Sequence, residues 1–231
     1  MKFIKRVLIL ILIVVIIIAT IFMAKGKKMY EDALQGTSLE SVVESIKCGR
    51  NYVKIQDLPQ DYINAVIAVE DNRFRKHGAI DSIAIMRALW INISTSSFKE
   101  GGSTITQQVA KNILYIEETD VVVRKIAEIR TAIDLEKIYS KDEILELYVN
   151  TIYFGDGYYG IKEACNGYLD KEPIDMTLYD STMMAGIPNA PSIYAPTANP
   201  ELTKSRQQKV ISDMVEYGYI SQEEANNIQE N

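Results

Sequence analysis

The chain has 231 residues, which is enough for one medium-sized domain and an appendage. Its formal net charge of −6 argues against a nucleic-acid partner, because nucleic-acid-binding domains are usually basic. With two cysteines and one histidine, the sequence offers neither a disulfide framework, nor an HExxH metalloprotease site, nor the usual zinc spacings.

An uncharged apolar run occupies residues 7–23. As a helix it would be about 25 Å long, close to the ~30 Å hydrocarbon core of a bilayer. The alternative is a cleaved secretory signal, but the run exceeds the usual ~7–15 residues and no clean A-x-A site follows it. We therefore expect a transmembrane anchor over residues 1–29 and a globular domain over 30–231. Basic residues flank the run almost equally, so the positive-inside rule leaves the orientation nearly balanced, with a slight preference for N-in.

Behind the anchor the sequence is mostly helical in pattern. A β-like piece at 52–55 precedes Pro59. Periodicity then predicts helices over 62–73, 82–92, 103–114, 121–139, 141–150, 161–169 and 177–185. Ser140 and Glu143 form a candidate capping box for the helix that begins at residue 141. A proline-rich segment follows, and residues 204–231 resemble a helix pair broken at Gly218. We expect one mainly α domain.

The predicted helix over 62–73 carries a carboxylate in an unexpected place. Glu70 lies in the middle of an apolar stripe that includes Ile63, Val66, Ile67 and Phe74. Burial would raise the pKa of this carboxyl group towards the range of a general base. The structural alternative is a buried glutamate paired with an arginine.

A second carboxylate, Glu128, lies on the predicted helix over 121–139. Arg130 and Asp134 mark the exposed side of that helix, and Glu128 and Lys125 point away from it. Arg124 lies one turn before Glu128, so an ordinary i,i+4 ion pair is the alternative to a functional role.

The segment GGSTITQQVAKN, residues 101–112, leads two glycines into a helix with Ser103 as the candidate N-cap. Free N–H groups at such a helix start suit anions such as phosphate. The segment is not a Walker A loop, because the Gly-Lys-Ser/Thr is missing. Thr104, Gln108 and Lys111 share one face of the predicted helix. Two carboxylates and several cations suit displacement at a sugar carbon with a phosphate leaving group.

These segments resemble the glycosyltransferase family 51 domain of penicillin-binding proteins and monofunctional transglycosylases. The resemblance covers about residues 58–201 in five blocks in the family's order. The blocks are AVEDNRFRKHGAID (68–81), GGSTITQQVAKN (101–112), RKIAEIRTAIDLEKIYSKDEILELYVNTIYFG (124–155), GYYGIKEACNGYLDK (157–171) and LYDSTMMAGIPNAPSIYAPTANPE (178–201). Five blocks in register are far more specific than any single motif.

The resemblance implies a lysozyme-like, two-lobed fold whose small lobe lies at the membrane. It implies Glu70 as the general base that takes the proton of the acceptor 4-hydroxyl, and Glu128 as the second catalytic carboxylate. Further implied substrate-binding or cleft positions are Ser103, Gln107, Gln108, Lys111, Asn112, Arg124, Lys125, Phe74 and His77. The metal ligands stay unknown, although the resemblance leaves a divalent cation, Mg or Mn, open; no organic cofactor is expected.

The resemblance further implies polymerisation of peptidoglycan glycan strands from lipid II, with inversion to a β-1,4 bond and release of undecaprenyl pyrophosphate. The partners would be lipid II, the lipid-linked glycan chain, the membrane and other cell-wall synthesis proteins. We expect a single-pass protein of the bacterial plasma membrane with its domain on the extracytoplasmic face, and a monofunctional enzyme without a transpeptidase domain.

Two departures from the family pattern motivate an alternative. Asp120 and Ala127 stand where many members carry Arg and Lys, so a catalytically weak, membrane-tethered scaffold that binds lipid II or other cell-wall synthases stays open. A lysozyme-like hydrolase or lytic transglycosylase is disfavoured, since hydrolases do not need phosphate-directed basic residues.

Overall fold

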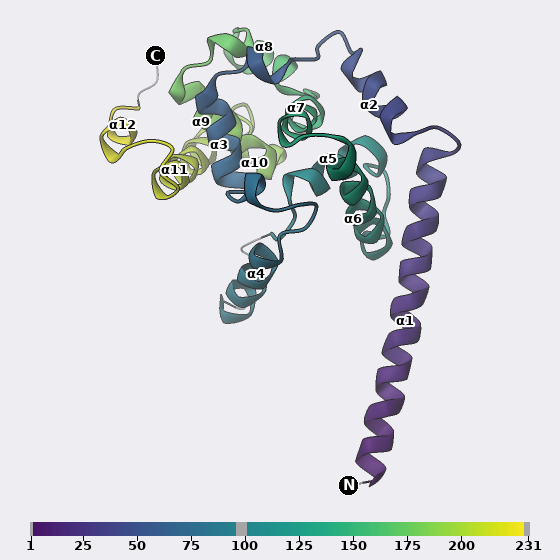
Figure 1. Cartoon of the computed structure of the whole chain (residues 1–231). Coiled ribbons are helices and arrows are strands. Elements are labelled where there is room, and N and C mark those ends of the chain that lie inside the picture. Colours follow the sequence, from purple (N-terminus) through teal and green to yellow (C-terminus); the bar gives the residue numbers. More distant parts are fainter. Residues whose placement is uncertain (1, 96–100, 229–231) are drawn as a thin grey trace.

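Helices make up the regular structure of the chain in the computed structural model, which describes residues 2–95 and 101–228 (Figure 1). The helices are α1 (Lys2–Leu34), α2 (Leu39–Lys47), α3 (Gln60–Glu70), α4 (Ser82–Thr95), α5 (Ile105–Leu114), α6 (Val121–Ile138), α7 (Lys141–Thr151), α8 (Ile161–Leu169), α9 (Leu178–Gly186), α10 (Pro191–Tyr194), α11 (Pro200–Glu216) and α12 (Gln222–Asn226). Single 3-10 turns form η1 (Ile55–Asp57), η2 (Phe74–Lys76), η3 (Pro173–Asp175) and η4 (Ile187–Asn189). The expectation of a mainly α fold is confirmed.

The β-like piece at 52–55 does not form a strand, and that prediction is wrong. The side-chain amide of Asn150, near the end of α7, takes the place of a partner strand. Its Oδ1 accepts a hydrogen bond from Val53 N at 2.8 Å, and its Nδ2 donates to Val53 O at 2.8 Å. Because one side chain satisfies both backbone groups, the extended segment needs no second strand.

The N-terminal helix α1 is long and apolar enough to cross a membrane, and its apolar stretch is exposed. The helix does not end with the apolar run: it continues without a break to Leu34. The expected boundary between residues 29 and 30 therefore lies inside α1. The last turns of α1 pack along α6, so the anchor runs directly into the domain.

The core of the domain lies among α3, α5, α7, α9 and α11. Helix α3 packs against α9 and α11, and α5 packs against α6 and α7. Tyr62, Phe74, Leu135 and Leu147 are fully enclosed there. The fold thereby places the end of α3 beside one face of α5, where the predicted site residues lie.

Three helix ends were predicted, with differing success. The capping box of Ser140 and Glu143 at the start of α7 is confirmed. The break at Gly218, which has φ +75°, is also confirmed, although α11 begins earlier, at Pro200, because a proline suits the first helical position. The helix predicted over 62–73 is shifted: α3 begins at Gln60 and ends at Glu70, since Asp71 leaves the helical conformation with φ −160° and ψ 76°.

Helix α4 projects away from the other helices of the domain (Figure 1). It extends from the body in the same direction as the N-terminal part of α1. Its large apolar side chains are exposed: Ile83, Ile85, Met86, Leu89, Trp90 and Ile93. An apolar face of this kind marks a surface that contacts something other than water.

Candidate active site

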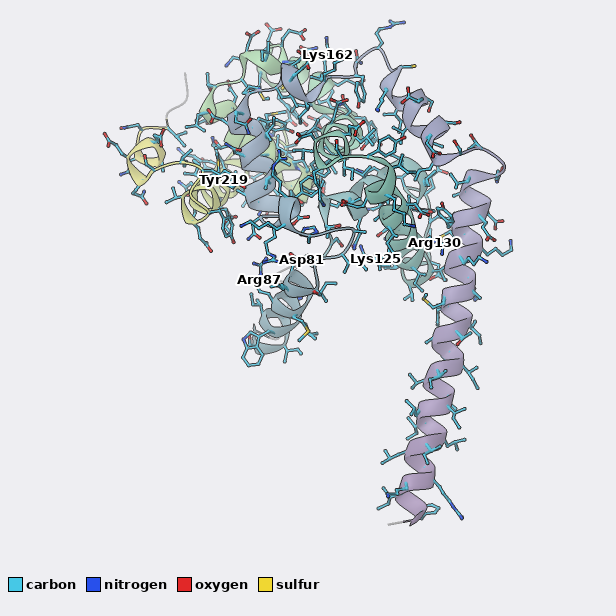
Figure 2. The ribbon with its side chains drawn as sticks, in the orientation of Figure 1. Asp81, Arg87, Lys125, Arg130, Lys162 and Tyr219 are labelled. Atoms are coloured by element: carbon cyan, nitrogen blue, oxygen red, sulfur yellow. The ribbon has the colours of Figure 1, made fainter. Side chains whose placement is uncertain are left out.

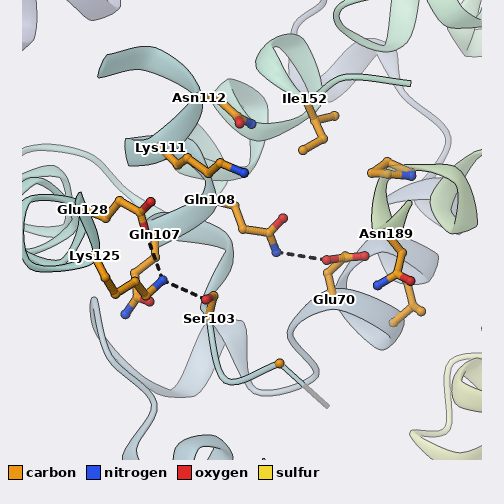
Figure 3. Close-up of a pocket in the computed structure, with 13 residues that line it drawn as sticks. Glu70, Ser103, Gln107, Gln108, Lys111, Asn112, Lys125, Glu128, Ile152 and Asn189 are labelled. Carbon is orange, nitrogen blue, oxygen red and sulfur yellow. Dashed lines mark hydrogen bonds and ion pairs between the residues drawn. The ribbon is translucent and has the colours of Figure 1, made fainter. Parts of the chain in front are cut away.

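A cavity of about 350 Å³ lies where the end of α3 meets α5, α6 and η4 (Figure 3). The residues that line it are Val69, Glu70, Gly101, Ser103, Gln107, Gln108, Lys111, Asn112, Lys125, Glu128, Ile152, Pro188 and Asn189. The structure therefore brings both predicted carboxylates, and most of the predicted substrate-binding residues, to one cleft.

Glu70 is the last residue of α3, and its side chain is 10% exposed. Its Oε2 accepts a hydrogen bond from Gln108 Nε2 at 2.9 Å, whereas its Oε1 makes no hydrogen bond with the described residues. Arg206 Nη2 lies 3.8 Å from that oxygen, so the arginine partner expected under the structural alternative is present. Burial raises the pKa of Glu70, and the Gln108 hydrogen bond and the Arg206 charge oppose that rise. A buried carboxylate with one free oxygen has the form of a general base.

Glu128 lies on α6 on the opposite side of the cavity and is 3% exposed. Arg124 Nε lies 3.1 Å from its Oε1, and Lys125 Nζ lies 3.0 Å from its Oε2. The predicted i,i+4 pair with Arg124 is thus present within the cleft wall. Lys125 also donates to Ser103 Oγ at 2.8 Å, which joins α6 to the loop before α5. Each oxygen of this carboxylate faces one cation.

The start of α5 differs from the expected anion site. The N-cap is Thr104 rather than Ser103: Thr104 Oγ1 accepts from Gln107 N at 3.2 Å and donates to Ala79 O at 3.0 Å. Ser103 turns towards Lys125 instead. Asp71 Oδ2 accepts the Ile105 N–H at 3.1 Å. Two of the N–H groups at this helix start therefore already have acceptors within the protein, and fewer are left for a phosphate.

Phe74 and His77 lie beside the cleft rather than in its lining. His77 Nε2 lies 2.7 Å from Asp71 Oδ1, and the Phe74 ring is completely buried nearby, edge-on to His77. Burial raises the pKa of Asp71, and the His77 hydrogen bond and charge oppose that rise. His77 thus holds Asp71, the neighbour of Glu70, and neither His77 nor Phe74 lines the cavity.

Asp71, His77 and Asp81 form the one group of three metal-ligand types that lie close together in the described part of the chain. Their ligand atoms are already in use. Asp71 binds His77 and a backbone N–H, and Asp81 binds Arg73 at 2.9 Å and two backbone N–H groups of α4. This group is a structural network.

The remaining predicted residues differ in whether they line the cavity. Lys111 and Asn112 line the cavity from α5, and the Asn112 amide nitrogen has no hydrogen-bond partner among the described residues. Arg124 lies beside the lining, where its Nη1 donates to Glu118 O at 2.7 Å. Lys111 and Lys125 therefore supply the positive charge that faces the cavity directly.

A second cavity of about 440 Å³ continues on the other side of Glu70. It shares Val69, Glu70, Gly101, Ser103 and Asn189 with the first, and α4 and α11 form its far wall. Arg206 and Asn189 were not predicted as site residues. Asn189 lies in the proline-rich segment, whose turns only weakly indicate a functional loop. Nothing in the sequence pattern of α11 marks Arg206 as a site residue. Glu70 thus stands between two cavities.

The two departures from the family pattern lie outside these linings. Asp120 is the N-cap of α6, where its Oδ1 accepts from Val123 N at 3.1 Å. Ala127 is completely buried. Neither residue lines either cavity.

Comparison with known proteins adds to this geometry. The family model described as Transglycosylase matches residues 36–215. The chain is 44% identical over 176 residues to penicillin-binding protein 1F of Bacillus subtilis (strain 168), covering 76% of this chain and 24% of that protein. It is 44% identical over 172 residues to penicillin-binding protein 1A of Neisseria lactamica, covering 74% and 21%. The chain therefore spans about a quarter or less of the length of these curated relatives.

A solved structure also matches. The crystal structure of penicillin-binding protein 1A from Haemophilus influenzae has 24% sequence identity and a TM-score of 0.45, and the match covers 76% of this chain and 16% of that chain.

Proposed function

Because the chain belongs to the Transglycosylase family, we propose that it is a peptidoglycan glycosyltransferase that polymerises glycan strands. The growing lipid-linked chain is the donor, and the 4-hydroxyl of lipid II is the acceptor. The observation that carries this proposal is Glu70 Oε1, a buried carboxylate oxygen that makes no hydrogen bond with the described residues, beside a cavity that Lys111, Lys125 and Glu128 also line.

In the proposed reaction, Glu70 Oε1 takes the proton of the acceptor 4-hydroxyl. The hydroxyl oxygen forms a bond to the anomeric carbon of the donor as the bond from that carbon to the pyrophosphate oxygen breaks. Attack from the side opposite the leaving group inverts the α linkage to β-1,4, and undecaprenyl pyrophosphate departs. Gln108 holds the other oxygen of Glu70 and so fixes the direction of Oε1.

The leaving pyrophosphate gains negative charge as the bond breaks. Lys111 and Lys125 face the cavity and would neutralise this charge without rearrangement. Glu128 holds Lys125 and Arg124 in place from within the wall. We therefore propose Glu128 as the residue that orders the cations, since its own oxygens already face them.

We propose that the cleft holds no resident divalent cation. Each oxygen of Glu128 faces a cationic side chain, and the ligand atoms of Asp71, His77 and Asp81 are used in protein contacts. Adding magnesium, manganese or a chelator to the polymerisation assay tests the expectation that Mg or Mn takes part.

A lipid-linked substrate requires an active site close to the membrane. Helix α1 offers an apolar span, and the exposed apolar face of α4 extends in the same direction (Figure 1). Lys125, which lines the cavity, lies on the side of the body from which α4 and the N-terminal part of α1 project (Figure 2). We propose a single-pass membrane protein whose domain lies on the extracytoplasmic face.

The second candidate function is a lipid II-binding scaffold with weak catalysis. The two are separated by incubating the purified full chain with labelled lipid II, beside Glu70→Gln, which keeps the shape of the side chain and removes its basicity. Polymer from the unaltered chain and none from the variant supports the enzyme. Lipid II binding by both without polymer overturns it and supports the scaffold.

A further inference from the structure

The anchor helix and the catalytic helix run side by side and in the same direction over the last turns of α1. We call this contact the α1–α6 seam, formed by Gly26 and Tyr30 of α1 and by Ile126, Arg130 and Asp134 of α6. A Cβ atom on Gly26 would lie 2.4 Å from Ile126 Cγ2 and 3.3 Å from Val123 O. The two helices approach closely here only because position 26 has no side chain.

One turn further on, the α1–α6 seam becomes polar. Tyr30 Oη donates a hydrogen bond to Asp134 Oδ2 at 2.9 Å, and the Arg130 guanidinium lies 5.5 Å from the centre of the Tyr30 ring. Figure 2 shows Arg130 on the side of α6 next to α1. Close backbone contact at Gly26 and a directional hydrogen bond at Tyr30 together fix both the rotation and the register of α1 on α6.

The register sets a height for the active site. Gly26 lies three residues beyond Met23, where the apolar run ends, and Glu128 lies two residues beyond Ile126. At a rise of 1.5 Å per residue, Glu128 lies about 7 Å past the end of the apolar run. The polar headgroup layer on each side of a bilayer is roughly 5–8 Å thick. Glu128 and Lys125 are therefore level with the headgroups, where the pyrophosphate of a lipid-linked substrate lies.

The first turn of α6 agrees with this height. By the same register, Val121 and Val122 are level with the last residues of the apolar run. Their side chains are 63% and 54% exposed. Exposed valines at this level fit the boundary between headgroups and acyl chains better than they fit water.

We propose that Gly26 and Tyr30 are positioning residues: by docking the membrane anchor on α6, they hold Lys125 and Glu128 at the level of the lipid phosphates. Because α1 is continuous from Lys2 to Leu34, no loose linker separates the membrane span from the seam. The anchor is then part of the active-site scaffold as well as a tether. The catalytic consequence rests on the proposed function, whereas the docking itself does not.

Four variants of the full chain in phospholipid vesicles test the proposal. Gly26→Leu forces the helices apart, because its side chain would overlap Ile126. Ala24→Leu adds the same kind of side chain at an exposed position of α1 and serves as the matched control. Gly26→Leu combined with Ile126→Ala returns space to the seam. Tyr30→Phe removes only the hydrogen bond to Asp134.

Two measurements report the docking of α1 on α6 and do not depend on enzymatic activity. Amide hydrogen exchange over residues 26–34 reports whether α1 is packed on α6. Trp90 on α4 is the only tryptophan of the chain and is 74% exposed, so its quenching by lipids brominated at defined chain positions reports how deep the domain sits. We expect faster exchange and an altered quenching profile for Gly26→Leu, no change for Ala24→Leu, and recovery in the double variant. Unchanged exchange and quenching in Gly26→Leu would overturn the docking.

The third measurement is polymerisation. With long-chain lipid II in vesicles we expect kcat/KM of Gly26→Leu to fall about tenfold or more, and that of Tyr30→Phe to fall less. With a short-chain substrate in solution, which needs no fixed height, Gly26→Leu should keep the unaltered rate. Equal losses on both substrates would show damage to the fold and overturn the positioning role. If the unaltered chain makes no polymer, the proposed function fails, while exchange and quenching still decide the seam.

Discussion

Replacing Gln108 by methionine tests how Glu70 is held ionised. Methionine keeps the length of the side chain and removes the N–H that donates to Glu70 Oε2 at 2.9 Å. Hydrogen bonds to charged groups contribute about 1.5–3 kcal/mol, so the balance between ionised and protonated Glu70 moves towards the protonated form by roughly tenfold or more. Burial already raises the pKa of Glu70. Losing the opposing hydrogen bond raises the pKa further.

The direction in which the pH profile moves depends on the role of Glu70. A general base acts in its ionised form, so activity falls as the pH falls through the pKa of Glu70. A higher pKa therefore moves the acidic limb of the kcat/KM profile to higher pH. In Gln108→Met, polymerisation should fall about tenfold or more on the acidic limb and recover on the alkaline side. Initial rates with labelled lipid II across a pH series measure this.

The control is Asn112→Ala, which removes another amide from the same cavity without touching Glu70. Its activity can fall at every pH, but its acidic limb should stay in place. An unmoved limb in Gln108→Met would refute the argument that this hydrogen bond sets the ionisation of Glu70. A uniform loss at all pH values would show instead that Gln108 serves substrate binding alone.

Three further predictions concern stability and reactivity. Asp120→Ala should lower the free energy of unfolding by about 0.5–2 kcal/mol through loss of the α6 N-cap, and Asp120→Asn much less, as denaturant titration would show. Gly160→Ala should destabilise by more than about 1 kcal/mol, because φ is +81° and a Cβ would lie 2.8 Å from a backbone oxygen, whereas Gly78→Ala, with open space around it, should be tolerated. A thiol reagent should modify exposed Cys48 and spare Cys165, whose pKa burial raises to about 12, until denaturant is added.

The two carboxylates could be located from local pattern alone. Glu70 interrupts an apolar stripe, and Glu128 has Arg124 one turn before it, so helical periodicity brings each to an inward face. The Ser140 capping box is local in the same sense. Each of these features depends on residues within one or two turns, which the sequence displays directly.

Features decided by distant contacts could not be located in this way. Helix α3 ends at Glu70 because the Asp71 side chain bonds to His77 and to the backbone at the start of α5. Thr104 caps α5 in place of Ser103. The Thr104 hydroxyl is held by its hydrogen bond to Ala79 O, and the Ser103 hydroxyl accepts a hydrogen bond from Lys125. Arg206 reaches Glu70 from α11, far away in sequence. Such choices depend on partners that periodicity does not reveal.

The structure also bears on the choice between polymerase and scaffold. The case for a scaffold rests on positive charge missing at positions 120 and 127. Asp120 serves as the N-cap of α6 and Ala127 is completely buried, so both residues have a structural place on α6. Lys111 and Lys125 still face the cavity. The buried carboxylate of Glu70 also lines the cavity, and the proposed polymerase needs both this carboxylate and these cations, whereas a scaffold needs only binding.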